Sequence, residues 1–113
     1  MKKFTKICSI LAILGVLVPC TNVYATTNSV WSDGHSFEED WEDYEEGSNW
    51  EMVYGYNTSW IDEDYTHTKH TKKSHKAAIS NEDDSDYDSA KKDKWAKIEI
   101  THAGSTVMYG IIY

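Results

Sequence analysis

The sequence predicts an all-β fold, a small antiparallel β-sandwich, for residues 26–113. Apolar and polar residues alternate from Trp50 to Tyr56 and again from Trp95 to His102, which is the two-residue period of half-buried strands. Turn-forming residues follow both runs, at 57–59 and at Ala103-Gly104-Ser105. Because each run has one apolar face, two small antiparallel sheets packed face to face are expected.

Residues 1–25 are predicted to be a signal peptide and are excluded from the fold. Three lysines, Lys2, Lys3 and Lys6, precede an apolar stretch from Ile7 to Val18 that is too short to span a bilayer comfortably. Val23-Tyr24-Ala25 places small residues where a signal peptidase reads them, so cleavage after Ala25 and a secreted, extracellular product are expected. The alternative is a lipoprotein acylated on Cys20, but Pro19 stands where a lipobox has Gly or Ala.

The 88 residues from Thr26 to Tyr113 are predicted to form a single domain, which buries roughly 60–65% of its unfolded surface. Both cysteines, Cys8 and Cys20, precede this domain, so no disulfide stabilises it. All five Trp and seven of the eight Tyr lie within it. Stability is therefore expected from aromatic packing, from a metal or from self-association, and a homodimer is one expected solution.

The charge of the domain is strongly negative but unevenly distributed. Eight Lys oppose nineteen Asp and Glu, a net charge of −11, which argues against nucleic acid as a partner. Seven acids lie between Glu38 and Glu46, and five more lie between Glu82 and Asp88. Between these tracts, seven of the ten residues from His67 to Lys76 are Lys or His.

The alternation places further strands at 60–65, at 76–80 and at 106–113. The run at 50–56 is expected to pair with 60–65 as a hairpin, and 95–102 with 106–113 as a second hairpin. Glu38 to Glu46 is expected to form an acidic loop, because like charges four residues apart disfavour a helix.

No motif of catalysis is present, so an enzyme is not expected. The domain has no Cys, no Gly-x-Ser-x-Gly and no His-Glu-x-x-His. His67, His70 and His75 match no zinc spacing, and no metal site is assigned. Asp84, Asp86 and Asp88 resemble the start of a calcium loop without its glycine, so no cofactor is predicted beyond weak divalent-cation binding by the acidic clusters.

The basic segment from His67 to Lys76 is interpreted as an anion site. Lys side chains act as point-charge partners of phosphate, and protonated His side chains add donors. We expect Lys69, Lys72 and Lys73, together with His75, to meet a phosphate group. The alternative is simple pairing of these charges with the acidic tracts.

The order of several short motifs resembles the lactococcin 972 family of secreted bacteriocins. The motifs are Trp31-x-x-Gly34, then Tyr65, His67, Lys72 or Lys73, His75 and Ala77 or Ala78, then Lys94-Trp95-Ala96-Lys97, and finally Tyr109 and Tyr113. The resemblance implies a β-sandwich, often dimeric, that binds the cell-wall precursor lipid II and blocks septum formation in related Gram-positive bacteria. The ligand-binding residues it adds to the anion site are Tyr65, His67, Trp95 and Lys97.

Two departures from the family pattern leave a second function open. Phe37 to Glu51 looks like an acidic insertion, and the net charge is unusually negative for a protein that approaches an anionic envelope. The alternative is a non-toxic secreted module that binds cell-wall glycan through exposed Trp and Tyr faces.

Overall fold

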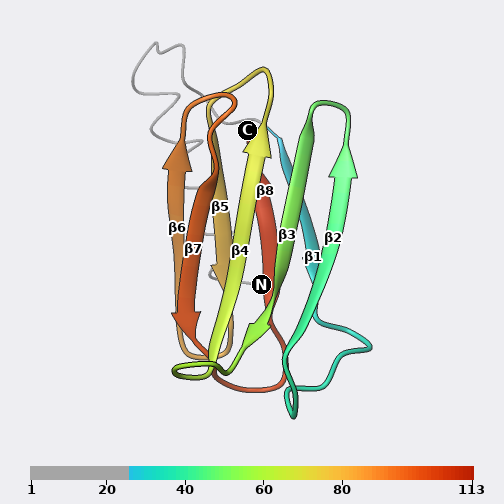
Figure 1. Cartoon of the computed structure of the whole chain (residues 1–113), viewed down its shortest axis with the longest axis vertical. Coiled ribbons are helices and arrows are strands. Elements are labelled where there is room, and N and C mark those ends of the chain that lie inside the picture. The colour runs from blue at the N-terminus through green and yellow to red at the C-terminus, as the bar shows by residue number, and fades with distance from the viewer. Residues whose placement is uncertain (1–25) are drawn as a thin grey trace.

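The computed structural model describes residues 26–113. The predicted signal peptide, with its cleavage site and both cysteines, lies outside the described residues. Two four-stranded antiparallel sheets face each other in the described part (Figure 1), and this confirms the predicted all-β class. The described residues contain no helix long and apolar enough to cross a membrane.

Eight strands make up the two sheets. They are β1 (Thr27–Trp31), β2 (Trp41–Gly47), β3 (Trp50–Asn57), β4 (Glu63–His70), β5 (His75–Ser80), β6 (Ser85–Ala90), β7 (Ala96–Thr101) and β8 (Met108–Ile112). One sheet has the strand order β1-β8-β5-β6 and the other has the order β2-β3-β4-β7. Four connections cross between the sheets, so each end of the sandwich carries loops from both.

The predicted hairpin around residues 57–59 is present as β3 and β4. Met52, Tyr54 and Tyr56 face the core from β3, as the alternation indicated. The second strand begins later than expected, at Glu63, and continues to His70. Six of the ten residues of the basic segment are therefore in strands, and only residues 71–74 form a turn between β4 and β5.

The predicted hairpin of 95–102 with 106–113 is wrong. β7 pairs with β4, whereas β8 lies in the opposite sheet between β1 and β5. Residues 102–107 cross the end of the sandwich instead of turning back in one sheet. Ile100 of β7 and Tyr109 of β8 do join one core cluster, but β8 is buried on both faces, because Met108 and Ile112 belong to a second cluster with Ala78.

The expected acidic loop at 38–46 is also wrong, because residues 41–47 form β2 at the edge of a sheet. β2 pairs along its whole length with β3, from Trp41 opposite Tyr56 to Gly47 opposite Trp50. An extended strand turns successive carboxylates to opposite faces, which separates like charges that a helix would bring together. Six of its seven residues are exposed, and charge on such an edge disfavours pairing with another strand.

The core lies between the sheets and contains an unexpected polar stripe. Its main cluster comprises Met52, Tyr54, Ile79, Ile100, Val107 and Tyr109. The inward face of β4, by contrast, is polar throughout, with Asp64, Thr66, Thr68 and His70 all buried. The Asp64 carboxylate accepts hydrogen bonds from Asn81 Nδ2 at 3.0 Å and His102 Nδ1 at 2.9 Å.

The two ends of the sandwich carry opposite charge. The loops 32–40, 58–62, 81–84 and 102–107 form the acidic end and contain eight Asp and Glu and no Lys. The turns 71–74 and 91–95 lie together at the opposite end with five Lys and one Asp, which we call the lysine end. Its lysines are Lys72, Lys73, Lys91, Lys92 and Lys94. The molecule therefore has a charge dipole along its strands.

Candidate functional site

The structure separates the predicted site residues into three places. Tyr65, His67 and Lys69 lie on the outer face of β4, because they alternate with its buried residues. Lys97 joins them from β7, since it stands opposite His67 in the strand register. Lys72 and Lys73 are exposed in the 71–74 turn, about a strand's length from Tyr65, whereas His75 lies inside.

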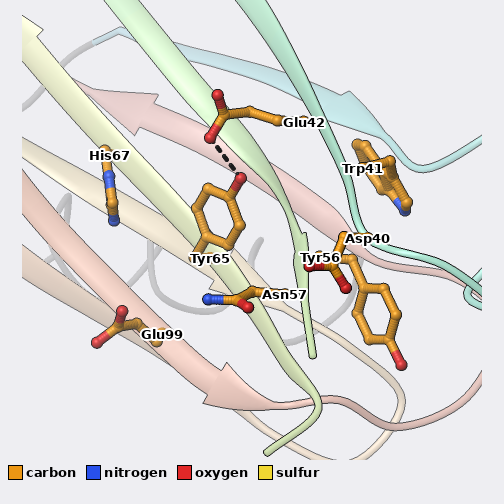
Figure 2. Close-up of a pocket in the computed structure, with 8 residues that line it drawn as sticks. All are labelled: Asp40, Trp41, Glu42, Tyr56, Asn57, Tyr65, His67 and Glu99. Carbon is orange, nitrogen blue, oxygen red and sulfur yellow. Dashed lines mark hydrogen bonds between the residues drawn. The ribbon is translucent and has the colours of Figure 1, made fainter. Parts of the chain in front are cut away.

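The first of these places is built around a row of residues that crosses the outer face of the β2-β3-β4-β7 sheet. Glu42 stands opposite Gly55, Gly55 opposite Tyr65, and Tyr65 opposite Glu99. Tyr65 reaches across Gly55, and its hydroxyl donates to Glu42 Oε2 at 2.6 Å (Figure 2). A Cβ atom at position 55 would lie 2.1 Å from the Trp41 carbonyl oxygen, so only glycine fits in the middle of this row.

A pocket of about 440 Å³ opens beside this row. Its lining combines aromatic rings with carboxylate, amide and imidazole groups, from Asp40, Trp41, Glu42, Tyr56, Asn57, Tyr65, His67 and Glu99. Figure 2 shows the side chains of Tyr65, His67 and Glu99 on neighbouring strands of the same sheet. Such a combination of a flat ring and several hydrogen-bonding groups suits a small polyhydroxylated ligand.

The protonation states of the pocket follow from burial and from its carboxylates. Burial raises the pKa of Tyr65, and the hydrogen bond to Glu42 raises it further. Burial lowers the pKa of His67, and the nearby Lys97 ammonium has the same effect. His67 is therefore uncharged at neutral pH, and the pocket presents an acidic and not a basic surface.

The 71–74 turn is built on His70, the last residue of β4. His70 Nδ1 accepts hydrogen bonds from the backbone N–H groups of both Lys72 and Lys73, each at 3.0 Å. Because that nitrogen accepts, it carries no proton. Both lysine side chains project into solvent, and none of Lys69, Lys72 and Lys73 forms an ion pair within the part of the chain that the structure describes.

The assignment of His75 to the anion site is wrong. The side chain is fully buried at the start of β5, where its ring nitrogens lie 3.0 Å from the Lys73 carbonyl oxygen and 3.2 Å from that of Thr68. Its ring therefore connects the turn to β4 and meets no solvent ligand. Trp95, in contrast, is 39% exposed and is the last residue of the turn 91–95 at the lysine end.

Sequence reasoning missed the second half of the lysine end. The Asp93 backbone N–H donates to the carbonyl oxygen of His70 at 2.8 Å, which places the turn 91–95 beside the turn 71–74. Lys91, Lys92 and Lys94 thereby join Lys72 and Lys73, although about twenty residues separate the two groups. For the pocket, the sequence does carry one signal, Gly55. A glycine inside a strand marks a place where another group approaches the backbone closely.

The acidic residues that resembled a calcium loop lie along or next to β6. Asp84, Asp86 and Asp88 alternate in extended backbone, and Asp88 Oδ2 accepts from the Lys97 backbone N–H at 3.0 Å. Residues 26–113 contain no group of three or more His, Asp or Glu side chains placed to hold a metal ion.

Comparison with known proteins finds no protein-family model, no curated protein and no solved structure that matches this chain. The resemblance to the lactococcin 972 family therefore stays a prediction from the motifs quoted above.

Proposed function

We propose that the chain is a secreted antibacterial protein without enzymatic activity, which binds lipid II and so blocks septum and cell-wall synthesis in related Gram-positive bacteria. The observation that supports this proposal most directly is the 71–74 turn. It holds Lys72 and Lys73 in solvent at one end of a rigid sandwich, without a carboxylate partner among residues 26–113. Lysine ammonium groups in this arrangement suit the pyrophosphate of lipid II.

The charge dipole supports the same proposal, because it orients the molecule. The acidic end is repelled by an anionic envelope, whereas the lysine end is attracted to it. The net charge of −11 therefore opposes adsorption in general but not an approach with the lysine end first. The acidic strand β2 makes no ion pair with Lys72 or Lys73 in the described structure, so neither lysine is paired directly with a carboxylate of that strand.

Co-sedimentation tests this proposal. The full chain is expressed and the protein is purified. The amount that pellets with neutral phospholipid vesicles is then measured with and without lipid II in the vesicles, once in calcium and once in chelator. We expect selective pelleting with lipid II, and its loss in the variant Lys72→Glu with Lys73→Glu. The control reverses two acids of the other end, Glu38→Lys with Glu39→Lys, which changes the net charge by the same amount in the opposite direction. Equal pelleting with and without lipid II, or full binding by the folded Lys72/Lys73 variant, contradicts the proposal.

The pocket beside Tyr65 favours a second candidate, a module that binds cell-wall glycan. The ring of Tyr65 lies against Gly55 with its hydroxyl held by Glu42, so a sugar could stack there without ordering a mobile side chain. Asn57, Asp40 and Glu99 provide hydrogen-bonding groups around it.

Glycan binding is tested with soluble oligosaccharides from digested peptidoglycan that carry no phosphate. Tyr65→Ala should abolish binding, whereas Tyr44→Ala should not, because Tyr44 is an exposed tyrosine of the adjacent edge strand outside the pocket. Binding that survives Lys72→Glu with Lys73→Glu but not Tyr65→Ala would favour the glycan module over the lipid II reading. Absence of binding to wild type would exclude the glycan module for these fragments.

A further inference from the structure

The lysine end is held together by one residue, His70. Its ring Nδ1 accepts from the N–H groups of Lys72 and Lys73, and its carbonyl oxygen accepts from the N–H of Asp93. These three hydrogen bonds, all donated by backbone N–H groups, fix both turns relative to the end of β4. The backbones of the two lysine-bearing turns are therefore neighbours.

The second turn is itself closed. The Lys94 backbone N–H donates to the Lys91 carbonyl oxygen at 3.1 Å, and Asp93 adopts a φ of 64°, in the left-handed region. Asp tolerates this conformation better than most residues. The turn therefore presents Lys91, Lys92 and Lys94 from a defined backbone.

The five lysines are poorly neutralised by the protein. Asp93 is the one carboxylate within the two turns, and none of the five lysines forms an ion pair in residues 26–113. Lys73 has an aromatic partner, since its Nζ lies 5.6 Å from the centre of the Tyr113 ring. Like charges held close together repel one another, and a multivalent anion relieves that repulsion.

We propose that the two turns form a single binding site for a ligand with two or more neighbouring phosphate groups, with Lys72 and Lys73 on one side and Lys91, Lys92 and Lys94 on the other. The inference deepens the proposed function, because it adds the second turn and requires more than one phosphate. A single phosphate neutralises only one turn, whereas a longer anion bridges both. Trp95 is the last residue of the second turn and offers an apolar contact next to the anion.

The required chemistry occurs in two sources, the pyrophosphate of a lipid-linked precursor and the phosphodiester chain of an anionic wall polymer. Inorganic pyrophosphate represents the first, and soluble poly(glycerol phosphate) represents the second. Inorganic tripolyphosphate measures the site itself, without lipid or sugar.

Isothermal titration of the purified protein with tripolyphosphate and with orthophosphate tests the inference. We expect one tripolyphosphate per chain, with much weaker binding of orthophosphate. Lys91→Gln with Lys92→Gln should lower the affinity for tripolyphosphate by about tenfold or more, as should Lys72→Gln with Lys73→Gln. The control is Ser36→Asp with Ser59→Asp, which makes the same change in net charge at two exposed positions of the acidic end and should leave binding nearly unchanged.

The outcomes separate this inference from the proposed function. If the Lys91/Lys92 variant binds tripolyphosphate as tightly as the control, or if wild type binds two molecules per chain, the single site is overturned whatever lipid II does. If both lysine variants lose tripolyphosphate but wild type does not pellet with lipid II, the site stands and the lipid II proposal fails. A preference for pyrophosphate or for poly(glycerol phosphate) then identifies the source.

Discussion

The carbonyl oxygen of His70 accepts a hydrogen bond from the backbone N–H of Asp93 at 2.8 Å. This bond joins the end of β4 to the turn before β7, while the ring of the same histidine holds the turn before β5. One residue therefore determines the backbone of two turns that carry five lysines. Changes at His70 should affect both stability and anion binding.

Two replacements of His70 should show how much its role as a hydrogen-bond acceptor contributes to stability. His70→Phe removes the acceptor of two backbone N–H groups and is expected to cost about 1–3 kcal/mol of unfolding free energy. His70→Asn keeps an acceptor oxygen close to the position of Nδ1 and should cost less. Urea denaturation at pH 7.5 measures both. Equal losses in the two variants would show that the acceptor is unimportant.

The pH dependence of stability should change in the same variants. Burial lowers the pKa of His70 below 6.5, and His75 and Lys73 add to this effect. As the pH falls below 6.5, the unfolded chain takes up a proton that the folded chain resists, so wild type loses stability. His70→Asn lacks this group and should lose less between pH 7.5 and pH 5. If the urea midpoints of wild type and His70→Asn fall in parallel across that range, the assignment is contradicted. His67→Asn is the comparison, because the pKa of His67 is also lowered.

Gly55→Ala should damage the pocket and loosen β2. The new Cβ would lie 2.1 Å from the Trp41 carbonyl oxygen and 3.0 Å from the Tyr65 hydroxyl, so backbone must move, at a cost of about 1–3 kcal/mol. Hydrogen exchange should accelerate in β2. Gly34→Ala is the matched control, because its Cβ meets nothing within 4 Å and only its φ of 86° is unfavourable. Faster exchange in β2 in both variants, or in neither, would refute the steric explanation.

The alternation of residues predicted which faces are buried but not which strands pair. Ile100 and Tyr109 pack in one core cluster, yet β7 and β8 belong to different sheets. A two-residue period is identical for a hairpin and for a strand that crosses the sandwich, so neighbouring sequence was a misleading guide. β2 could not be predicted in this way because its acidic side chains give it no apolar face, and backbone hydrogen bonds to β3 hold it in the sheet.

The expected strand at 60–65 ended too early to show how the candidate site is arranged. Tyr65, His67 and Lys69 share the outer face of β4, which continues to His70, whereas His75 was assigned by its proximity to lysines and is buried. The joining of Lys91, Lys92 and Lys94 to Lys72 and Lys73 depends on a tertiary hydrogen bond. No local pattern in the sequence encodes that bond.

Asp64 should be among the most costly residues to remove. It is fully buried and accepts from His102 Nδ1 and from Asn81 Nδ2, whose second hydrogen goes to the Thr101 carbonyl oxygen. Asp64→Ala leaves the His102 donor and one Asn81 hydrogen without an acceptor and is expected to cost about 3–5 kcal/mol, whereas Asp64→Asn keeps one acceptor oxygen and should cost less. Asp86→Ala, at an exposed position of β6, should change stability by about 0.5 kcal/mol or less. Similar urea midpoints for Asp64→Ala and Asp86→Ala would overturn this assignment.

Two threonines of the same stripe should behave in the opposite way. The hydroxyls of Thr66 and Thr68 are buried and have no hydrogen-bond partner in the described structure. Valine has nearly the same shape without the unpaired hydroxyl, so Thr66→Val and Thr68→Val should leave the unfolding free energy unchanged or raise it by about 1 kcal/mol. Thr66→Ala is the control, because it removes the same hydroxyl but leaves a cavity, and it should destabilise the protein. A loss of more than about 1 kcal/mol in the valine variants would mean that the hydroxyls have a partner, such as a buried water molecule that bridges them to the core.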